Sequence, residues 1–313
     1  MIIGIDFTGR LGNQLFTYAF ARNMMTLYAG QDCKLVANFK RSSNGDAEKG
    51  FEDGLQYFQV LPYCVEKSDL VLRYGSWSQR IAYLFYQLFT RIPLLADKET
   101  LLDAMHRKME RWGIFITTPA DQAYPLRRIS FRHIFIKGYF QDKNFFKAIR
   151  PLLVSELIPR QPVMEENRHL YEIASRPHTV CVHVRRGDFL SPEYKKDFYL
   201  CTPRYFQEAI SLMRKRVAEP TFIFFSDDME WVKENFNLPD VPCYYERSHN
   251  PAWESLRLMY SCHHFIISNS TFSWWAQYLG RREDKIVISP SRWYANDQWH
   301  SCLVDDSFLQ ISC

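Results

Sequence analysis

The second half of the chain alternates short apolar runs with longer amphipathic segments. The apolar runs are rich in β-branched and aromatic residues and predict five strands, at residues 179–184, 222–226, 242–245, 264–268 and 285–289. Between them, apolar positions recur at helical spacing and predict helices at 203–217, 228–237, 252–262 and 271–279. This alternation predicts an α/β unit with a parallel, Rossmann-like sheet.

The first half begins in the same way but is less regular. Residues 1–6 predict a strand, and Asn13 is the expected cap of a helix that runs to about Ala29. Residues 34–38 and 134–140 predict two further strands. The sequence between them gives no clear sheet pattern.

Two prolines near residue 160 indicate a domain boundary. Pro159 and Pro162 lie close together between the two halves, and such segments commonly separate domains. We therefore expect one domain over residues 1–158 and a second over residues 159–313.

Residues 79–95 are apolar and aromatic, with arginines near both ends. A core helix is the interpretation that we favour for this segment. Docking on an anionic membrane surface is the alternative, because interfacial helices combine aromatic residues with basic ones.

The composition is that of a globular protein. The 313 residues are 47% hydrophobic and 24% charged, and the length favours two domains. The net charge of +4 is mild and does not require a nucleic-acid partner. The first residues lack the basic leader of a signal peptide, and no apolar run reaches the ~18 residues of a membrane span. We expect a cytoplasmic protein, with peripheral contact at the inner membrane as the alternative.

Polar residues stand at the carboxyl ends of three predicted strands, at residues 183–188, 226–228 and 268–273. Carboxyl ends of parallel strands share one edge, where open α/β sheets bind ligands, so we expect these segments to line one site. Arg185 and Arg186 offer planar guanidinium donors that suit a phosphate. An Arg–Asp ion pair that closes a surface loop is the alternative for this segment alone.

The other two segments suggest further chemistry. Ser270 and Thr271 open a predicted helix, whose N–H groups and hydroxyls can hold phosphate oxygens. A helix cap followed by buried aromatic residues is the alternative. Asp227 and Asp228 could bind a metal, but a helix cap is the interpretation that we favour. The eight cysteines include no CxxC pair, so the sequence indicates no zinc site.

The glycine-containing loop at residues 8–12 joins a strand to a helix, which is a common place for an anion. Its sequence, GRLGN, fits neither the GxGxxG fingerprint nor a P-loop. Taken alone, the loop is a weak signal.

With these segments together, the chain resembles the α-1,2-fucosyltransferases of glycosyltransferase family 11, of bacterial type. Residues 183–189 (HVRRGDF) match the family's His-x-Arg-Arg-x-Asp-aromatic element, and residues 9–14 (GRLGNQ) match its N-terminal element. Residues 266–279 and 225–228 resemble two others. The four occur in family order.

The resemblance implies a GT-B fold, in which two Rossmann-like domains face each other across a cleft. Residues 1–158 would form the acceptor-side domain and residues 159–313 the domain that binds GDP-fucose. The implied reaction is an inverting transfer of L-fucose from GDP-β-L-fucose to the 2-hydroxyl of a terminal β-galactoside, in O-antigen, capsule or oligosaccharide synthesis. GDP-fucose would be a co-substrate, with no cofactor and no essential metal.

The resemblance also implies roles for single residues. Arg185 would neutralise the β-phosphate of the departing GDP, Asn13 would contact the diphosphate, and Asp188 would orient the arginines. Asp227 or Asp228 would face the guanine. The residues expected to bind the substrates are His183, Arg10, Gly12, Arg186, Ser226, Asp227, Asp228, Asn269, Ser270, Thr271 and Ser273. The sequence identifies no general base.

Three rival functions remain at this stage. They are transfer from another GDP-sugar, a non-catalytic glycan- or nucleotide-binding GT-B scaffold, and nucleic-acid binding. Assays with GDP-fucose and GDP-mannose distinguish fucose transfer from transfer of another GDP-sugar. Detection of turnover distinguishes an enzyme from a non-catalytic scaffold. No nucleic-acid-binding module is recognisable. The expected partners are GDP-L-fucose and a galactose-terminated oligosaccharide or lipid-linked glycan, with membrane contact as an open alternative.

Overall fold

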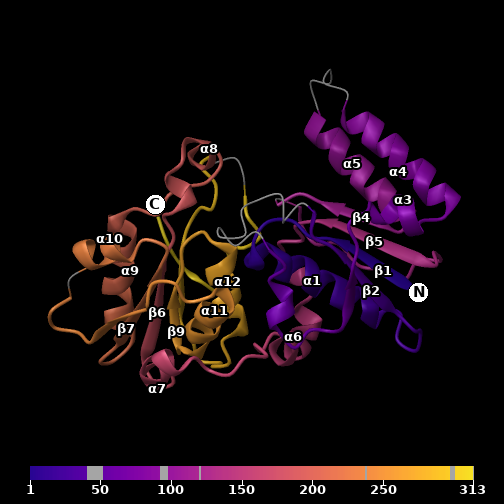
Figure 1. Ribbon diagram of the computed structural model, residues 1–313. Helices are drawn as coiled ribbons and strands as arrows, with labels where there is room; N and C mark the ends of the chain where they lie inside the picture. Colours follow the sequence, from indigo (N-terminus) through magenta and orange to yellow (C-terminus); the bar gives the residue numbers. More distant parts are fainter. Residues whose placement is uncertain (41–51, 92–97, 120, 237, 297–299, 313) are drawn as a thin grey trace. The chain divides into compact units, whose positions relative to one another are not determined.

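The computed structural model describes residues 1–40, 52–91, 98–119, 121–236, 238–296 and 300–312. The chain forms two compact units, one of Met1–Gln56 with Val60–Glu156 and the other of Tyr57–Gln59 with Leu157–Cys313. Each unit contains one sheet with helices on both faces (Figure 1). The predicted α/β class with two Rossmann-like units is confirmed.

The division between the units lies next to the predicted boundary, with one exchange of chain. Tyr57–Gln59 belongs to the second unit although it lies far from that unit in the sequence. Phe58 forms a bridge with Pro159, and the Nε of Arg160 donates to the backbone oxygen of Phe58 at 2.5 Å. These contacts tie the early loop to the start of the second unit.

The sheet of the first unit has the order β3-β2-β1-β5-β4, and every pair is parallel. Its strands are β1 (Ile2–Asp6), β2 (Lys34–Asn38), β3 (Tyr63–Val65), β4 (Ile114–Thr117) and β5 (His133–Gly138). Its helices are α1 (Leu11–Thr26), α3 (Leu70–Tyr74), α4 (Trp77–Thr90), α5 (Lys98–Glu110) and α6 (Arg150–Glu156). In Figure 1, α1 and α6 lie on one side of this sheet, and α3, α4 and α5 lie on the other.

The sheet of the second unit has the order β11-β10-β9-β6-β7-β8 and is also parallel throughout. Its strands are β6 (Thr179–Val184), β7 (Thr221–Ser226), β8 (Cys243–Tyr245), β9 (His264–Ile266), β10 (Val287–Pro290) and β11 (Leu309–Ile311). Its helices are α7 (Arg168–Ala174), α8 (Pro192–Lys195), α9 (Pro203–Arg216), α10 (Met229–Asn235), α11 (Ala252–Ser261) and α12 (Thr271–Leu279). The predicted strands and helices of this half all form, with shifts of a residue or two at some ends.

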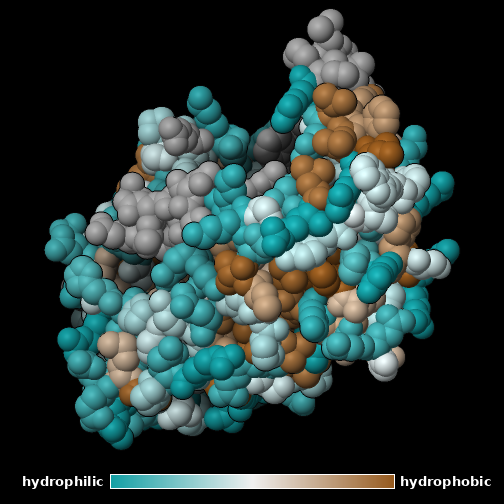
Figure 2. All heavy atoms as spheres, turned by 45° about the vertical axis from the view of Figure 1, so that its right-hand side comes forward, coloured by the Kyte–Doolittle hydropathy of each residue, from teal (hydrophilic) through white to brown (hydrophobic). Residues whose placement is uncertain are grey.

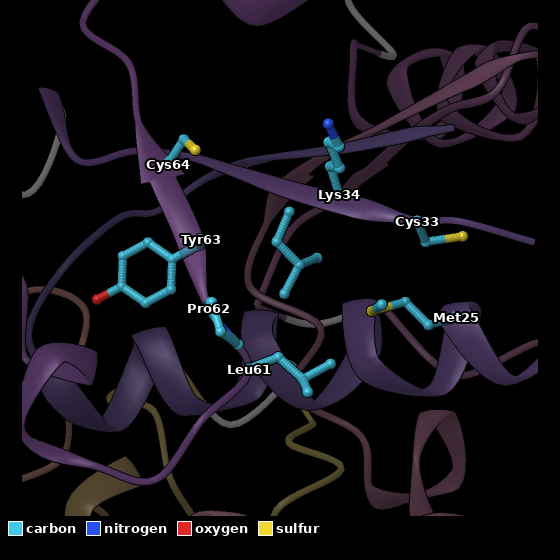
Figure 3. Close-up of a pocket in the computed structure, with 8 residues that line it drawn as sticks. Met25, Cys33, Lys34, Leu61, Pro62, Tyr63 and Cys64 are labelled. Atoms are coloured by element: carbon cyan, nitrogen blue, oxygen red, sulfur yellow. The ribbon is translucent and has the colours of Figure 1, made fainter.

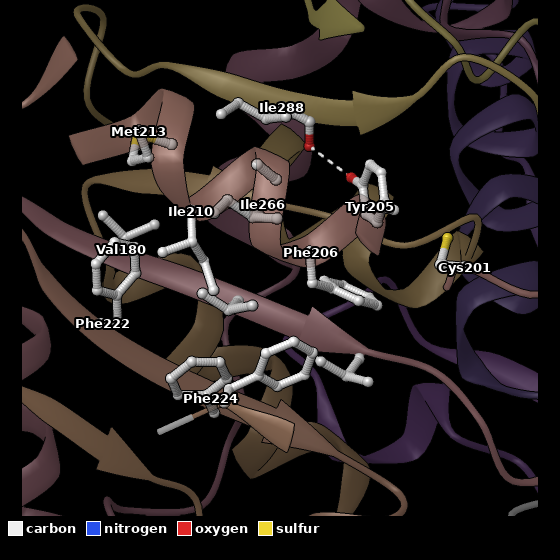
Figure 4. Close-up of a cluster of buried hydrophobic side chains, with 14 of the residues drawn as sticks. Val180, Cys201, Tyr205, Phe206, Ile210, Met213, Phe222, Phe224, Ile266 and Ile288 are labelled. Carbon is white, nitrogen blue, oxygen red and sulfur yellow. Dashed lines mark hydrogen bonds between the residues drawn. The ribbon is translucent and has the colours of Figure 1, made fainter. Parts of the chain in front are cut away.

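Apolar side chains of β6, β7 and α9 form the core of the second unit. Figure 4 shows Val180 of β6 with Phe206 of α9 in this cluster. Tyr205 on α9 is buried, and its hydroxyl lies 2.5 Å from the backbone oxygen of Ile267 and 3.5 Å from that of Ile288. Because the hydroxyl is paired, its burial leaves no polar group unsatisfied. This core fixes the strands whose ends carry the predicted site.

A buried ion pair attaches the start of the second unit to α11. The Arg257 guanidinium pairs with Glu254, which is fully buried. Arg257 also donates to the backbone oxygens of Gln161 at 2.7 Å and Pro162 at 2.8 Å, and Glu254 accepts from the backbone N–H of Met164 at 3.1 Å. A charge pair this deep is retained only when its remaining donors and acceptors are satisfied, as they are here.

The first unit departs from the sequence prediction in several places. Helix α1 begins at Leu11 with Arg10 as its N-cap residue, so the prediction that Asn13 caps it was wrong. Strands β3 and β4 were not predicted, because each has only three or four residues and lies in a region of mixed pattern. After β5, residues 143–149 form two 3-10 turns, and α6 follows them.

The prediction of a core helix at residues 79–95 was also wrong. The segment forms α4, of which the buried residues are Gln79 and Tyr83, while Trp77 is 80% exposed and Phe85 67% exposed. Residues 92–95 lie outside the described part of the chain. Figure 2 shows apolar side chains, in brown, gathered at the upper right of the view, the region where Figure 1 places α4 and α5. Within the described residues, no helix has the length and apolar content needed to cross a membrane.

Candidate functional site

The predicted site lies at the carboxyl edge of the second sheet, beside its central strand. Strand β6 pairs with β7 on one side and with β9 on the other. The chain passes from β6 to β7 and β8, then returns across β6 to form β9, so the strand order reverses between β6 and β9. Ligands of open α/β sheets bind at such a switch point. The three predicted polar segments follow these adjacent strands and therefore share this edge.

His183, near the end of β6, connects two of the segments. Its Nδ1 lies 2.9 Å from the hydroxyl of Ser268, which follows β9. The pKa of His183 is lowered to about 4, mainly by burial, which Asp227 opposes and the nearby Arg185 reinforces. The imidazole is therefore neutral at pH 7. It holds the two strand ends together as a hydrogen-bonding group and adds no positive charge for a diphosphate.

Arg185 is held by carboxylates from two segments. Its Nη2 pairs with Asp188 in the same loop, and its Nη1 lies 2.6 Å from Oδ2 of Asp227, which follows β7. The side chain is 20% exposed, and its guanidinium lies 5.8 Å from the centre of the Phe189 ring. Two carboxylates and a ring fix the guanidinium plane, which is the kind of preorganisation that electrostatic catalysis needs. The predicted orienting position of Asp188 agrees with this geometry.

Arg186 lies in a different environment, against α10. Its Nε donates to Oδ2 of Asp228 at 3.0 Å, and its guanidinium stacks 3.7 Å from the centre of the Trp231 ring. Its backbone N–H donates to Oδ1 of Asp227 at 2.9 Å. Arg186 therefore fixes the loop against the neighbouring helix, with stacking and ion pairing acting together.

Gly187 allows the loop to pass close to Asp227. A Cβ at this position would overlap the Asp227 carboxylate, the group that accepts hydrogen bonds from both arginines. Any other residue here has to displace either the loop or the carboxylate. The glycine of the HVRRGDF segment is thus explained by close approach.

The two aspartates after β7 are occupied by these contacts. Asp228 caps α10 by accepting from the backbone N–H of Trp231 at 3.3 Å, and its own N–H donates to Oγ of Ser226 at 3.0 Å. The helix-cap interpretation of Asp228 is thus confirmed. Asp227 is held by Arg185. The contact of Asp227 or Asp228 with guanine stays a prediction. In this structure the two carboxylates are paired with Arg185 and Arg186, so such a contact would have to form beside or in place of these ion pairs.

The residues of the segment 268–273, predicted to bind phosphate, differ in exposure. Ser270 is the N-cap of α12 and, with Thr271, is partly exposed, so both can face a ligand. Asn269 is buried, and its amide donates to the backbone oxygens of Tyr199 at 2.5 Å and Trp293 at 2.8 Å. Asn269 therefore supports the fold.

Ser273 is fully buried, and its hydroxyl lies within hydrogen-bonding distance of the backbone oxygens of Ser268 and Ser270. Both side chains are buried and hydrogen-bonded within the protein, and the contact of Asn269 and Ser273 with substrate stays a prediction. Ser273 lies in the first turn of α12, which directs its side chain into the core, whereas Asn269 precedes the helix and is held by the two backbone oxygens.

The N-terminal element lies at the carboxyl end of β1 in the first unit. Gly9 has a positive φ of 69°, and a Cβ there would overlap the side chain of Asn13. Gly12 is buried in the first turn of α1, and Oδ1 of Asn13 accepts from Nε2 of Gln141 at 3.1 Å. Arg10 is partly buried at the N-cap position. The contact of Arg10, Gly12 and Asn13 with a diphosphate stays a prediction.

Two groups at the sheet edges were missed in the sequence. Glu246 follows the short strand β8, and burial raises its pKa to about 7, against hydrogen bonds from Ser255 and Asn250 that lower it. Lys137 near the end of β5 is buried, and the burial lowers its pKa, while its ammonium pairs with Asp6 at the end of β1. Glu246 could have been found by asking which charged residues follow predicted strands, whereas Lys137 lies within the strand predicted at residues 134–140.

The structure also contains a cluster of possible metal ligands and an apolar cavity, and neither forms part of the carboxyl edge of the second sheet. Among the described residues, Asp103, His106 and Asp121 lie close enough together to share a cation, and they belong to the first unit. A cavity of about 330 Å³ lies beside the start of β2, with Lys34 and Tyr63 in its lining (Figure 3). That is the amino end of the sheet, opposite the edge at which such sheets bind ligands.

Comparison with known proteins gives consistent relatives. The sequence profile described as "Glycosyl transferase family 11" matches residues 123–310. An "O-antigen biosynthesis glycosyltransferase WbnK" of Escherichia coli is 27% identical over 97% of this chain and 98% of its own length. An "Alpha-1,2-colitosyltransferase" of Escherichia coli is 31% identical over 52% of this chain and 57% of its own.

A "Galactoside alpha-(1,2)-fucosyltransferase 1" of Ateles belzebuth is 32% identical over 46% of this chain and 42% of its own length. Thus the chain matches only about half of the length of the last two relatives. Among solved structures, it is similar to a NodZ alpha-1,6-fucosyltransferase soaked with GDP-fucose, with 15% identity, coverage of 89% of this chain and 92% of that chain, and a TM-score of 0.47. That likeness is too distant to bear on activity.

Proposed function

Since the chain belongs to glycosyl transferase family 11, we propose that it transfers L-fucose from GDP-β-L-fucose to the 2-hydroxyl of a terminal β-galactoside, with inversion. Its two Rossmann-like α/β units give it the GT-B class that the sequence predicted. The product would belong to an O-antigen or a related oligosaccharide, and the acceptor would be a galactose-terminated glycan, free or lipid-linked.

The observation that supports this proposal most is the position of Arg185. It lies at the switch point of the second sheet, with its guanidinium plane fixed by Asp188 and Asp227. When the bond between fucose and the β-phosphate breaks, negative charge grows on the phosphate oxygens. A fixed guanidinium stabilises that charge more in the transition state than in the ground state, which lowers the barrier.

The local charge balance refines this role. Arg185 and Arg186 are surrounded by Asp188, Asp227 and Asp228, and His183 is neutral. The carboxylates thus outnumber the guanidiniums, and the loop alone is not a strong anion site. Ground-state attraction of GDP would therefore come largely from other groups, such as the N-terminus of α12 at Ser270. This favours a role for Arg185 in the rate more than in nucleotide affinity.

The relatives support the linkage and the pathway class. Two of those named above carry an α-1,2 linkage in their names, and the relative that matches along the whole chain is an O-antigen glycosyltransferase. A second candidate function follows from the same set: α-1,2 transfer of colitose, because a colitosyltransferase is 31% identical over half of this chain. The two activities differ in the donor sugar.

A donor competition with product analysis tests the proposal. Purified protein would be incubated with GDP-fucose, GDP-colitose or GDP-mannose and a panel of galactose-terminated glycans, and the product linkage would be determined by NMR. We expect turnover with GDP-fucose and an α-1,2 linkage to galactose. Preference for GDP-colitose would show that the chain is a colitosyltransferase, the second candidate function. No turnover with any donor would contradict both.

A further inference from the structure

The outward face of α4 is apolar except for Ser78 near its start. Its exposed side chains are Trp77, Ser78, Ile81, Leu84, Phe85 and Leu88. The five apolar ones are between 46% and 80% exposed. They recur at helical spacing and form one stripe, which we call the α4 stripe. Contiguous apolar surface of this kind marks a site of interaction more often than a chance exposure.

The inward face of α4 is held by polar contacts, so the helix cannot turn to bury the stripe. Nε2 of Gln79 donates to the backbone oxygens of Trp112 at 2.8 Å and His133 at 3.0 Å. The hydroxyl of Tyr83 donates to Oδ2 of Asp69 at 2.9 Å. Rotation would leave these groups unpaired, which costs free energy for each one.

The first turn adds to this restraint. Ser76 and Gln79 form a capping box at the start of α4, and the hydroxyl of Tyr86 lies 3.1 Å from Nε2 of His106. Gln79, Tyr83 and Tyr86 share one face of the helix, opposite the α4 stripe. The sequence therefore fixes an amphipathic helix with its apolar side toward solvent.

The charges around the stripe are mainly basic. Helix α4 itself contains an arginine and no acidic residue. The charged side chains described on α3, α4 and α5 and at the end of α4 are Arg73, Arg80, Arg91, Arg107, Lys108, Asp103 and Glu110, of which Arg73 is paired with Glu66 at 2.8 Å. An excess of arginine and lysine next to an apolar helix face complements an anionic lipid surface.

We propose that α4 is an interfacial helix that docks this protein on an anionic lipid bilayer. The α4 stripe would enter the boundary between headgroups and acyl chains, and Arg80 and Arg91 would contact lipid phosphates. Trp77 at the start of the stripe suits that boundary, where tryptophan is enriched. A second copy of the chain fits less well, because two such faces would bring their arginines together. The inference does not depend on which sugar is transferred.

Vesicle co-sedimentation tests the proposal. The full chain would be mixed with vesicles of phosphatidylcholine alone or of phosphatidylcholine with phosphatidylglycerol. The test variant is Ile81→Gln/Phe85→Gln, which keeps good helix formers and removes two apolar side chains from the stripe. The matched control is Val163→Gln, since Val163 is also an exposed apolar residue, at 43%, but lies in the second unit. Melting temperature and turnover on a soluble acceptor would be measured alongside.

We expect the wild-type chain to sediment with the anionic vesicles and only weakly with the neutral ones. The double variant should bind about tenfold more weakly or worse, because two large side chains leave the bilayer boundary, while its melting temperature and soluble-acceptor turnover stay unchanged. The Val163→Gln chain should bind like wild type. Absence of wild-type binding, or equal binding by the double variant, overturns the proposal. A dimer in sedimentation velocity that the double variant dissociates would assign the stripe to self-association instead.

Discussion

Gly187 determines whether the arginine loop keeps its geometry. A methyl group at this position would overlap the carboxylate of Asp227, which aligns Arg185. We expect Gly187→Ala to lower kcat/KM on the order of 10²-fold, as displacement of a catalytic group by an ångström can. Gly30→Ala is the control for kcat/KM, since no atom lies within 4 Å of its added Cβ, and the strain of its positive φ of 87° lowers stability away from the site. Steady-state kinetics on both variants checks this, and equal activities would contradict it.

His183 predicts a dependence of stability on pH. Its pKa is about 4 in the folded chain, because of burial, and near 6.5 when unfolded. Between these values the unfolded chain binds the extra proton, so the stabilisation present above pH 6.5 is lost as the pH falls toward 4. The loss should be about 3 kcal/mol. Urea unfolding of wild type, His183→Gln and the exposed-site control His249→Gln measures it. A pH slope unchanged in His183→Gln contradicts the account.

At this scale the sequence indicated where the chemistry lies but not how each side chain is used. The polar residues after β6, β7 and β9 could be predicted, because parallel strands end at one edge. Pairing Arg185 with Asp227 could not, since the two are joined only by the register of β6 against β7. The burial of Ser273 could not be predicted either, because it depends on the direction of the first turn of α12.

Helix α4 is the element whose role differs most from the expectation. Phe85→Asp should leave the melting temperature within a few degrees of wild type, because the side chain is already 67% exposed. Tyr83→Ala should lower stability by about 3 kcal/mol, because it removes a buried ring. Thermal unfolding followed by circular dichroism compares the two variants. If the Phe85→Asp chain is as unstable as the Tyr83→Ala chain, Phe85 packs in the core and the surface assignment of this face of α4 is wrong.

The periodicity of α4 reveals an apolar stripe without revealing what the stripe faces. The same pattern serves a core helix and a surface helix, and the difference lies in the polar anchors Gln79 and Tyr83, whose partners are distant in sequence. The second half was predictable for the opposite reason. Its strands are flanked by helices whose apolar faces have a sheet to cover, so local pattern and tertiary packing agree.

The division of the whole chain into two α/β units follows from the strand–helix alternation and the prolines near residue 160. The inclusion of Tyr57–Gln59 in the second unit does not, because it depends on hydrogen bonds of these residues with residues 158–160, about 100 positions later in the chain. A contact between segments that distant leaves no local pattern in the sequence.

Metal independence is a prediction for the molecule as a whole. In our proposal Arg185, and not a metal ion, stabilises the negative charge of the departing GDP. The aspartates after β7, which could otherwise bind a metal, are paired with arginines. We therefore expect EDTA to leave the initial rate of transfer nearly unchanged. The rate would be measured before and after dialysis against EDTA, and again with Mn²⁺ or Mg²⁺ added. A loss in EDTA that either ion restores would assign a metal to the reaction.

The central claim is that Arg185 stabilises the charge that develops on departing GDP. Arg185→Lys keeps the positive charge but loses the planar fork held by Asp188 and Asp227. Arg186→Lys is the matched comparison, because Arg186 contacts Asp228 and Trp231 and serves mainly to fix the loop.

The measurement is kcat for fucose transfer beside the Kd for GDP in both lysine variants, with circular dichroism to verify folding. The account predicts that Arg185→Lys lowers kcat by about 10²–10³-fold, the usual cost of one preorganised donor, while the Kd for GDP changes far less. Arg186→Lys should be milder in kcat. A folded Arg185→Lys chain with near-native kcat, or one whose loss appears entirely in the Kd for GDP, would contradict the account.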